Sequence, residues 1–298
     1  MQTRLGPLDA VHVVPEGERR GPPVLLLHGI GLGAWLWERD QQVLAAQGLE
    51  SWAVDLPGHG SDAGQNRSLD EIVEGALGAV DALERPAVVG HSLGGLVAQE
   101  LSAARELSSI VLVSSVAPRA VRVVPTRTAL RIMAQLLPTF LAGRNLNLSL
   151  GQYRDAGLHL LPTDEQEACF SRIVPWPNRA TRDLLRRPDL APASCPCLVT
   201  FGLQDKANAV SGYRLLGDYH DAIIWRFDDL AHMPPLEPGG QRHAEAIAGW
   251  ILSPRSRIVT EVDPLAPKEG VGEQKRRRRM PGGPRSDSPF KKGRKDRD

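Results

Sequence analysis

The chain has 298 residues, of which 42% are hydrophobic and 24% charged, and its formal net charge is +1. This content can bury one large core. No run approaches the ~18 uninterrupted apolar residues of a membrane-spanning helix. Three cysteines, an odd number, exclude a complete disulfide framework. The first residues lack the apolar stretch of a secretory signal, so we expect a cytoplasmic protein.

Two short apolar runs near the start predict buried strands. Residues 24–27 are followed at once by His-Gly-Ile-Gly at 28–31, and residues 51–54 lead into Asp-Leu-Pro-Gly-His-Gly-Ser at 55–61. Strands that alternate with helical patterns favour one parallel sheet with right-handed crossovers. We therefore expect both glycine-rich turns at the carboxyl edge of that sheet, where such folds place their chemistry.

A third apolar run, residues 86–89, precedes the most informative turn of the chain. Gly-His-Ser-Leu-Gly occupies residues 90–94, and a helical pattern continues to residue 104. A Gly-x-Ser-x-Gly sequence between strand and helix holds its serine in a strained conformation with the hydroxyl exposed. Side chains at Gly90 and Gly94 would collide with neighbouring backbone, so both positions must be bare. The pattern predicts Ser92 as a nucleophile.

The strand pattern breaks after residues 110–113. Residues 118–190 contain no strand run, and we interpret them as a helical cap inserted over the active site. Within the cap, residues 129–137 predict a helix with Leu130, Met133 and Leu137 on one apolar face. We expect this face to pack on the core. One or two of the cap's apolar side chains should reach an acyl pocket; the candidates are Met133, Leu136, Leu137, Phe140 and Trp176.

The cap is also unusually basic. Residues 118–190 carry 11 arginines, no lysine and 6 acidic residues, while the rest of residues 1–253 is strongly acidic. Guanidinium groups bind carboxylates and phosphates in bidentate fashion, which suggests an anionic substrate. The alternative is that these arginines pair with acidic residues of the protein itself.

Two later strands end close to the partners that a serine nucleophile requires. The run at residues 197–201 precedes Asp205, and the run at 222–227 precedes His232. Nucleophilic serine needs a base to take its proton and an acid to orient that base. We expect Asp205 to accept the Nδ1–H of His232, and His232 Nε2 to deprotonate Ser92.

Taken in order, these motifs resemble the α/β-hydrolase family, in particular its lidded serine esterases and lipases. The similarity runs from about residue 12 to residue 252 and ends with His-Met-Pro-Pro-Leu-Glu at 232–237. One departure is Ala231, where the family often has glycine. The resemblance implies an α/β fold with a mostly parallel sheet of about eight strands, flanking helices and a helical cap.

The resemblance also implies a set of site residues. The triad would be Ser92, Asp205 and His232. The oxyanion hole would use the backbone N–H groups of Ile30 and Leu93. Glycines of the elbow and the oxyanion loop complete the set, namely Gly29, Gly90 and Gly94.

The expected activity is hydrolysis of a carboxylic ester of a small or acyl-chain substrate through an acyl-enzyme, with no metal and no cofactor. The same triad supports lactone, thioester and amide hydrolysis, acyl transfer, carbon–carbon bond hydrolysis and cofactor-free peroxidation. A non-catalytic, ligand-binding protein of the same fold is the alternative from another class.

We expect residues 1–253 to form the hydrolase domain and residues 254–298 to form a basic tail. The tail has 14 Lys or Arg against 7 Asp or Glu and is depleted of aromatic residues. It cannot bury enough apolar surface to fold alone, so we expect it to be disordered. Its basic runs suggest contact with an anionic surface or nucleic acid, and a solvated tail without a partner is the alternative.

Overall fold

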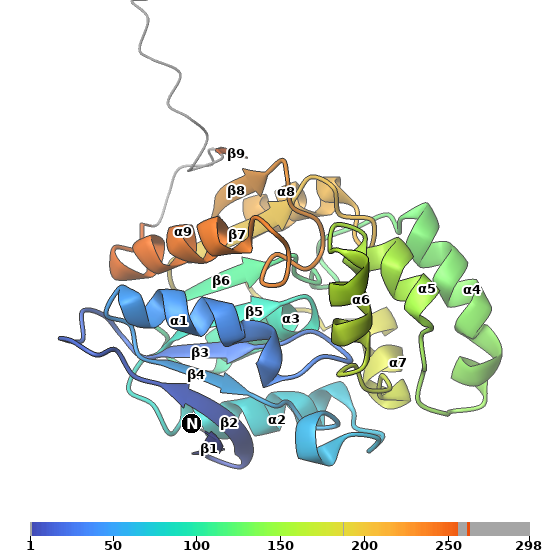
Figure 1. Ribbon diagram of the computed structural model, residues 1–298, viewed down its shortest axis with the longest axis horizontal. Coiled ribbons are helices and arrows are strands. Elements are labelled where there is room, and N and C mark those ends of the chain that lie inside the picture. The colour runs from blue at the N-terminus through green and yellow to red at the C-terminus, as the bar shows by residue number, and fades with distance from the viewer. Residues whose placement is uncertain (1, 187, 256–260, 263–298) are drawn as a thin grey trace, which may run out of the picture. The chain divides into compact units, whose positions relative to one another are not determined.

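The computed structural model describes residues 2–186, 188–255 and 261–262. One sheet runs through it in the strand order β1-β2-β4-β3-β5-β6-β7-β8-β9. The strands β3 to β9 are parallel, and β1 and β2 add an antiparallel edge (Figure 1). Their bounds are β1 Gln2–Leu5, β2 Leu8–Val13, β3 Val24–Leu27, β4 Ser51–Val54, β5 Ala87–His91, β6 Ser109–Val113, β7 Cys197–Gly202, β8 Ile223–Phe227 and β9 Glu261–Val262.

The central strands read as apolar runs because helices cover both faces of the sheet. Every residue of β3, β5, β6 and β7 is buried. Side chains of α2 (Leu69–Val80), α3 (Leu93–Ala104) and α8 (Val210–Tyr219) fill the core on one face. Those of α1 (Glu38–Ala46) and α9 (Gly240–Leu252) fill the other, together with the short helix η1 (Ala34–Trp37).

Strand register brings the carboxyl ends of the central strands level. Leu27 of β3 pairs with Gly90 of β5, and Gly90 pairs with Leu112 of β6. The turns that follow these strands therefore meet at one edge of the sheet. This is the edge at which the sequence predicts the chemistry.

A helical cap lies between β6 and β7, on the right in Figure 1. It confirms the predicted cap insertion, and its only β pairing within the described residues is the bridge between Leu146 and Trp176. It contains α4 (Arg127–Leu141), α5 (Leu150–Tyr153), a π-helical turn η3 (Arg154–Leu158), α6 (Thr163–Phe170) and α7 (Asn178–Arg186).

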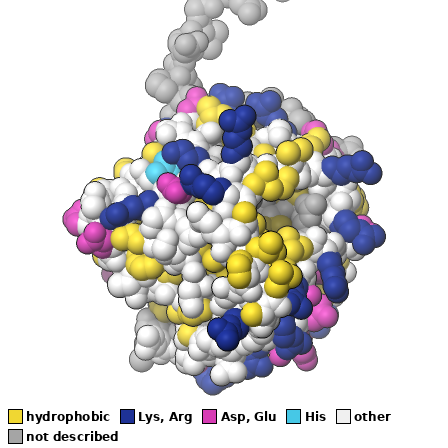
Figure 2. Space-filling model, turned by 90° about the vertical axis from the view of Figure 1, so that its right-hand side faces the viewer, with side chains coloured by type: hydrophobic (Ala, Val, Ile, Leu, Met, Phe, Trp, Pro, Cys, Tyr) yellow, Lys and Arg dark blue, Asp and Glu magenta, His cyan; other side chains and the backbone are white. Residues whose placement is uncertain are grey.

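The predicted inward face of α4 is wrong. Leu130 and Leu137 are 57% and 49% exposed, whereas Ile132 and Leu136 are buried. The helix carries apolar residues on both sides, so spacing alone cannot decide which side faces the core. Figure 2 views the cap side, where exposed hydrophobic side chains surround a hollow and Lys or Arg side chains lie around them.

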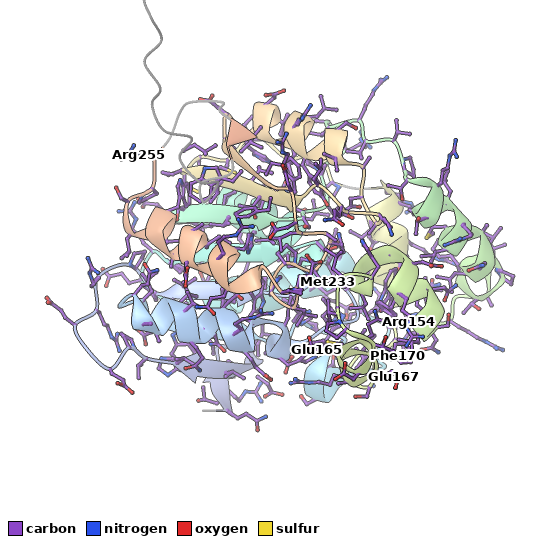
Figure 3. The ribbon with its side chains drawn as sticks, turned by 45° about the horizontal axis from the view of Figure 1, so that its top comes forward. Arg154, Glu165, Glu167, Phe170, Met233 and Arg255 are labelled. Carbon is purple, nitrogen blue, oxygen red and sulfur yellow. The ribbon has the colours of Figure 1, made fainter. Side chains whose placement is uncertain are left out.

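Many cap arginines pair with carboxylates. Arg172 reaches Glu38 of α1 at 2.6 Å, and Arg179 reaches Glu71 of α2 at 2.8 Å. Within the cap, Arg154 lies beside Glu167, with 3.3 Å between Nη2 and Oε1 (Figure 3). These contacts favour the alternative in which the arginines serve structural ion pairs.

The last helix, α9, ends at Leu252, one residue before the expected boundary at residue 253. Beyond it, β9 pairs with β8 in parallel, where the sequence predicts no strand. Most of the expected disordered tail, residues 256–260 and 263–298, lies outside the described residues. None of the helices that the structure describes is long and apolar enough to cross a bilayer.

Candidate active site

Ser92 occupies the turn between β5 and α3 in a strained conformation, with φ 52° and ψ −112°. A β-carbon on Gly90 would collide with the carbonyl of Gly94, and one on Gly94 with the carbonyl of Leu27. The two glycines therefore allow the close backbone approach that the turn needs. The N–H of Ser92 donates to the carbonyl of Val113 at 3.0 Å, which ties the turn to β6.

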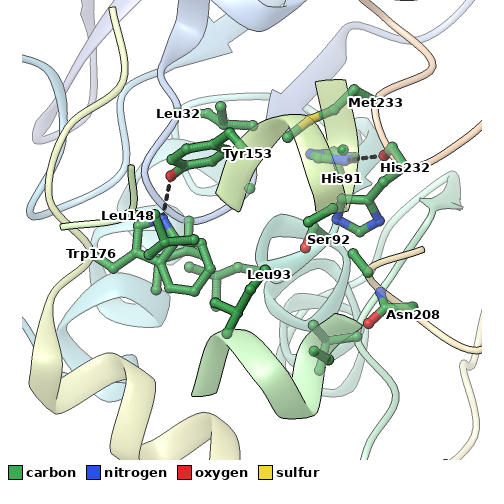
Figure 4. Close-up of a pocket in the computed structure, with 18 of the residues that line it drawn as sticks. Leu32, His91, Ser92, Leu93, Leu148, Tyr153, Trp176, Asn208, His232 and Met233 are labelled. Atoms are coloured by element: carbon green, nitrogen blue, oxygen red, sulfur yellow. Dashed lines mark hydrogen bonds between the residues drawn. The ribbon is translucent and has the colours of Figure 1, made fainter. Parts of the chain in front are cut away.

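His232 and Asp205 form a buried pair at the same edge. The Nδ1 of His232 lies 2.9 Å from Oδ2 of Asp205, and both residues are less than 10% exposed. The structure thus brings together the predicted acid and base, and His232 and Ser92 line one cavity (Figure 4). The backbone of His232 is held as well, because the Nε2–H of His91 donates to the His232 carbonyl at 2.8 Å.

Four donors surround the Asp205 carboxylate. Besides His232, the hydroxyl of Tyr213 donates to Oδ2, and the N–H groups of Ala207 and Asn208 donate to Oδ1 at 2.8 and 2.9 Å. Burial alone would raise the pKa of Asp205, but the positive charge of His232 and these hydrogen bonds outweigh it, so the pKa is lowered. Asp205 therefore stays ionised around neutral pH.

The interaction between Asp205 and His232 raises the pKa of His232, whereas it lowers that of Asp205. Burial lowers the pKa of the imidazole, and the charge of Asp205 together with their hydrogen bond raises it by more. The net result is a pKa above the ordinary value of 6.5. His232 can thus take up a proton near neutral pH and release it again.

Two neutral histidines shape the loop after β3. The N–H of Leu56 donates to Nε2 of His28, so the proton of His28 is on Nδ1 and is donated to the carbonyl of Gly29 at 2.8 Å. The N–H of Gly31 donates to Nε2 of His59 at 2.9 Å. Burial lowers the pKa of His28 to about 4 and that of His59 to about 3. Both rings remain neutral, as these hydrogen bonds require.

Two backbone N–H groups lie beside Ser92 without an acceptor among the described residues. Among the described residues, neither the N–H of Ile30 nor that of Leu93 donates to a protein acceptor. Both residues line the cavity that contains Ser92. An oxyanion hole requires two such N–H groups, next to the nucleophile and not bonded to a protein acceptor.

The cap meets this loop at Gly31, which has φ +79°. The N–H of Val174 donates to the carbonyl of Gly31 at 2.9 Å. The indole N–H of Trp176 donates to the hydroxyl of Tyr153 at 2.7 Å, and both groups would collide with a side chain at Gly31. Glycine is needed here because the cap fills the space beside it.

The cavity between cap and sheet has a volume of about 220 Å³. Its wall includes the polar side chains of Asn208, His91 and the Tyr153–Trp176 pair, and among the described residues no Lys, Arg, Asp or Glu lines it. Met133 and Trp176 are the two predicted pocket candidates that reach it. The apolar remainder includes Leu32, Val116, Ile132, Leu148, Leu184 and Met233.

The sequence assigned no role to three residues beside the site, although Glu237 ends the motif that begins at His232. Tyr213 and Asn208 hold Asp205, and nothing distinguishes a tyrosine on an apolar helix from a core aromatic residue. Glu237 holds the backbone on both sides of His232. The sequence does single out Glu237, because it is the one acidic residue in the apolar, proline-containing stretch that follows His232. A glutamate is seldom buried without hydrogen-bond partners.

A match to the alpha/beta hydrolase family model covers residues 24–250. The chain belongs to the alpha/beta hydrolase family. This α/β-hydrolase is 29% identical over 230 residues to a pimeloyl-[acyl-carrier protein] methyl ester esterase of Chromobacterium violaceum, covering 73% of this chain and 89% of that protein. It is 27% identical over 264 residues to a monoacylglycerol lipase of Mycolicibacterium smegmatis, covering 80% and 90%.

Solved structures agree on the fold of this α/β-hydrolase. The monoacylglycerol lipase of Paleococcus ferrophilus has a TM-score of 0.64 at 20% identity, covering 83% of this chain and 98% of that one. The esterase of Thermogutta terrifontis has a TM-score of 0.60 at 20% identity, covering 84% and 98%.

Proposed function

We propose that this α/β-hydrolase is a serine ester hydrolase that works through an acyl-enzyme. The observation that carries the proposal is the arrangement around Ser92. A strained serine shares an apolar cavity with His232, and His232 is bonded to the buried carboxylate of Asp205. Nucleophile, base and orienting acid are thus available in the order that the reaction needs.

In the proposed reaction, Nε2 of His232 takes the proton of Ser92 as its oxygen attacks the ester carbonyl. Asp205 keeps the other ring nitrogen protonated and stabilises the imidazolium. The N–H groups of Ile30 and Leu93 stabilise the oxyanion of the tetrahedral intermediate, each contributing about 10²–10³ in rate. The imidazolium then protonates the departing alcohol, and a water activated by His232 releases the acid.

The cavity wall supports an apolar, uncharged acyl group as the bound part of the substrate. In the part of the chain that the structure describes, no Lys, Arg, Asp or Glu side chain lines the cavity, so a charged group there would lose its hydration without a charged partner. The names of the similar relatives fit an ester with a carbon chain, since one is a methyl ester esterase and the other a monoacylglycerol lipase. We therefore propose acyl esters rather than small charged esters as substrates.

The test is a series of p-nitrophenyl esters of increasing acyl length, with a lactone and an anilide of matched size as controls. We expect kcat/KM to pass through a maximum within the series and to exceed the values for both controls. Ser92→Ala should lower kcat roughly 10⁶-fold without changing the melting temperature by more than a few degrees. Retention of more than a few per cent of activity in Ser92→Ala would contradict the proposal, as would faster turnover of the lactone or anilide.

A further inference from the structure

The segment that carries His232 is a loop, and a side chain from the same loop binds its backbone. It connects β8 to α9, and Glu237 lies within it with none of its surface exposed. Oε2 of Glu237 accepts from the N–H of Ala231 at 2.6 Å, and Oε1 accepts from the N–H of Met233 at 2.8 Å. One carboxylate therefore binds the peptide groups on both sides of His232.

Glu237 is itself anchored from outside the loop. The guanidinium of Arg39, on α1, donates to the carbonyl of Glu237 at 3.0 Å and to the carbonyl of Pro235 at 2.8 Å. The N–H of Gly240 donates to the same Glu237 carbonyl at 2.8 Å. Backbone and side chain of Glu237 are thus both fixed, so the carboxylate is a rigid support for the peptides that it binds.

The N–H groups of Ala231 and Met233 bind different oxygens of Glu237, so both oxygens must act as acceptors. A carboxylate meets this need, and hydrogen bonds to an ionised acceptor are roughly twice as strong as neutral ones. A glutamine would turn an NH₂ group toward one of the donors. A protonated glutamic acid would likewise turn an O–H toward one of them.

We propose that Glu237 is a positioning residue for His232. It fixes the peptides before and after the histidine, so that the imidazole can reach Ser92 while bonded to Asp205. The inference rests on the proposed function. Its physical basis is that a displacement of about 1 Å at a reacting group can cost about 10²-fold in rate, and that loops without such support are mobile.

The charge of Glu237 has a second effect on the same histidine. Its negative charge adds to that of Asp205 in raising the pKa of His232. Burial raises the pKa of Glu237 itself to about 7. The charged and titratable groups around this carboxylate are His232 and Asp205, with Arg39 on its carbonyl and neutral His91 on the carbonyl of His232. Removing the charge should therefore lower the pKa of His232.

The experiment compares Glu237→Gln and Glu237→Asp with the wild-type protein. The control is Glu245→Gln, an exposed carboxylate on α9 that accepts from the side chain of Gln241. For each we would measure the melting temperature, kcat and KM on the best ester, the pH profile of kcat/KM, and the rate at which a fluorophosphonate labels Ser92.

We expect Glu237→Gln to lower kcat and the labelling rate together by about 10–100-fold, with KM changed less than about threefold. The acid limb of its pH profile should move to lower pH. Glu237→Asp keeps the charge but is too short to bind both peptides, so kcat should fall while the acid limb stays in place. Glu245→Gln should match the wild type in every measurement.

A Glu237→Gln protein with wild-type kcat would overturn the proposal. So would a loss that only follows the folded fraction, with the acid limb unmoved. If Glu237→Gln does not fold, Glu237→Asp decides alone: wild-type kcat refutes the role, and a selective loss of kcat supports it. A wild-type protein that fluorophosphonate does not label and that cleaves no ester would refute the proposed function instead.

Discussion

The turns at the sheet edge and the cap above them are held by different kinds of interaction. The turns are fixed by buried hydrogen bonds, as between Asp205 and Tyr213, and by glycines in close contact with backbone, as at Gly94. In the described part of the chain, the cap adds two half-exposed ion pairs with the sheet domain, Arg172 with Glu38 and Arg179 with Glu71. In the proposed function, the turns supply the catalytic groups and the cap supplies part of the cavity wall.

The largest expected effect comes from breaking the rigid part at Asp205. Asp205→Asn should lower kcat by about 10⁴-fold, because the amide cannot hold the imidazole in its reactive tautomer. Activity requires neutral His232 and is lost as the pH falls through its raised pKa. Without the charge of Asp205 that pKa falls, so the residual activity should persist to lower pH.

The control for this change is Asp155→Asn, which removes an exposed cap carboxylate paired with Arg131. It should leave the profile of kcat/KM against pH unchanged. A loss below tenfold in Asp205→Asn, or an unmoved acid limb, would show that His232 is oriented in another way.

A second prediction contrasts two glycines. Gly94→Ala places a methyl group against the carbonyls of Leu27 and His28 and should destabilise the fold by at least about 2 kcal/mol. Gly151→Ala, in α5 of the cap, places its methyl group 3.8 Å from Oγ of Ser149, an ordinary contact, and should change stability by less than about 1 kcal/mol. Urea unfolding of both variants measures the difference, and equal losses would remove the distinction between the two regions.

A third prediction sharpens the contrast through selectivity. Met133 of α4 lines the cavity, while Leu130 on the same helix is 57% exposed. Met133→Ala enlarges the cavity and should shift the preferred acyl length upward, with a change of about tenfold in relative kcat/KM. Leu130→Ala should leave the acyl-length profile unchanged. If both shift it, α4 presents a different face to the substrate.

The smallest effect is expected at the ion pair between cap and sheet domain. Arg172→Gln breaks a contact whose side chains are 47% and 61% exposed. Such pairs are worth about 0–1 kcal/mol. The change in unfolding free energy should therefore stay within that range and shrink further in 1 M salt. A larger loss that salt does not reduce would mean that Arg172 acts through its stacking on Trp35.

The same contrast explains what the sequence could predict. Buried strands and the turn at Ser92 can be predicted from short stretches of sequence. A buried strand needs a run of apolar residues, and the turn needs glycines two residues before and two residues after Ser92. The inward face of α4 left no such signal, since both of its sides are apolar. The roles of Tyr213 and Arg39 depend on elements that meet only in the folded chain. A tyrosine or an arginine in a helix is otherwise an ordinary residue.

The cap contacts the sheet domain at Gly31, beside the loop that carries Ile30. Lifting the cap segment at Val174 would break its bond to the Gly31 carbonyl, one residue from the N–H of Ile30. By thermodynamic reciprocity, whatever favours the closed cap also favours the ordered loop, and the reverse holds equally. In the proposed reaction, an acyl group that fills the cavity and contacts the cap would therefore also stabilise the loop that supplies the N–H of Ile30.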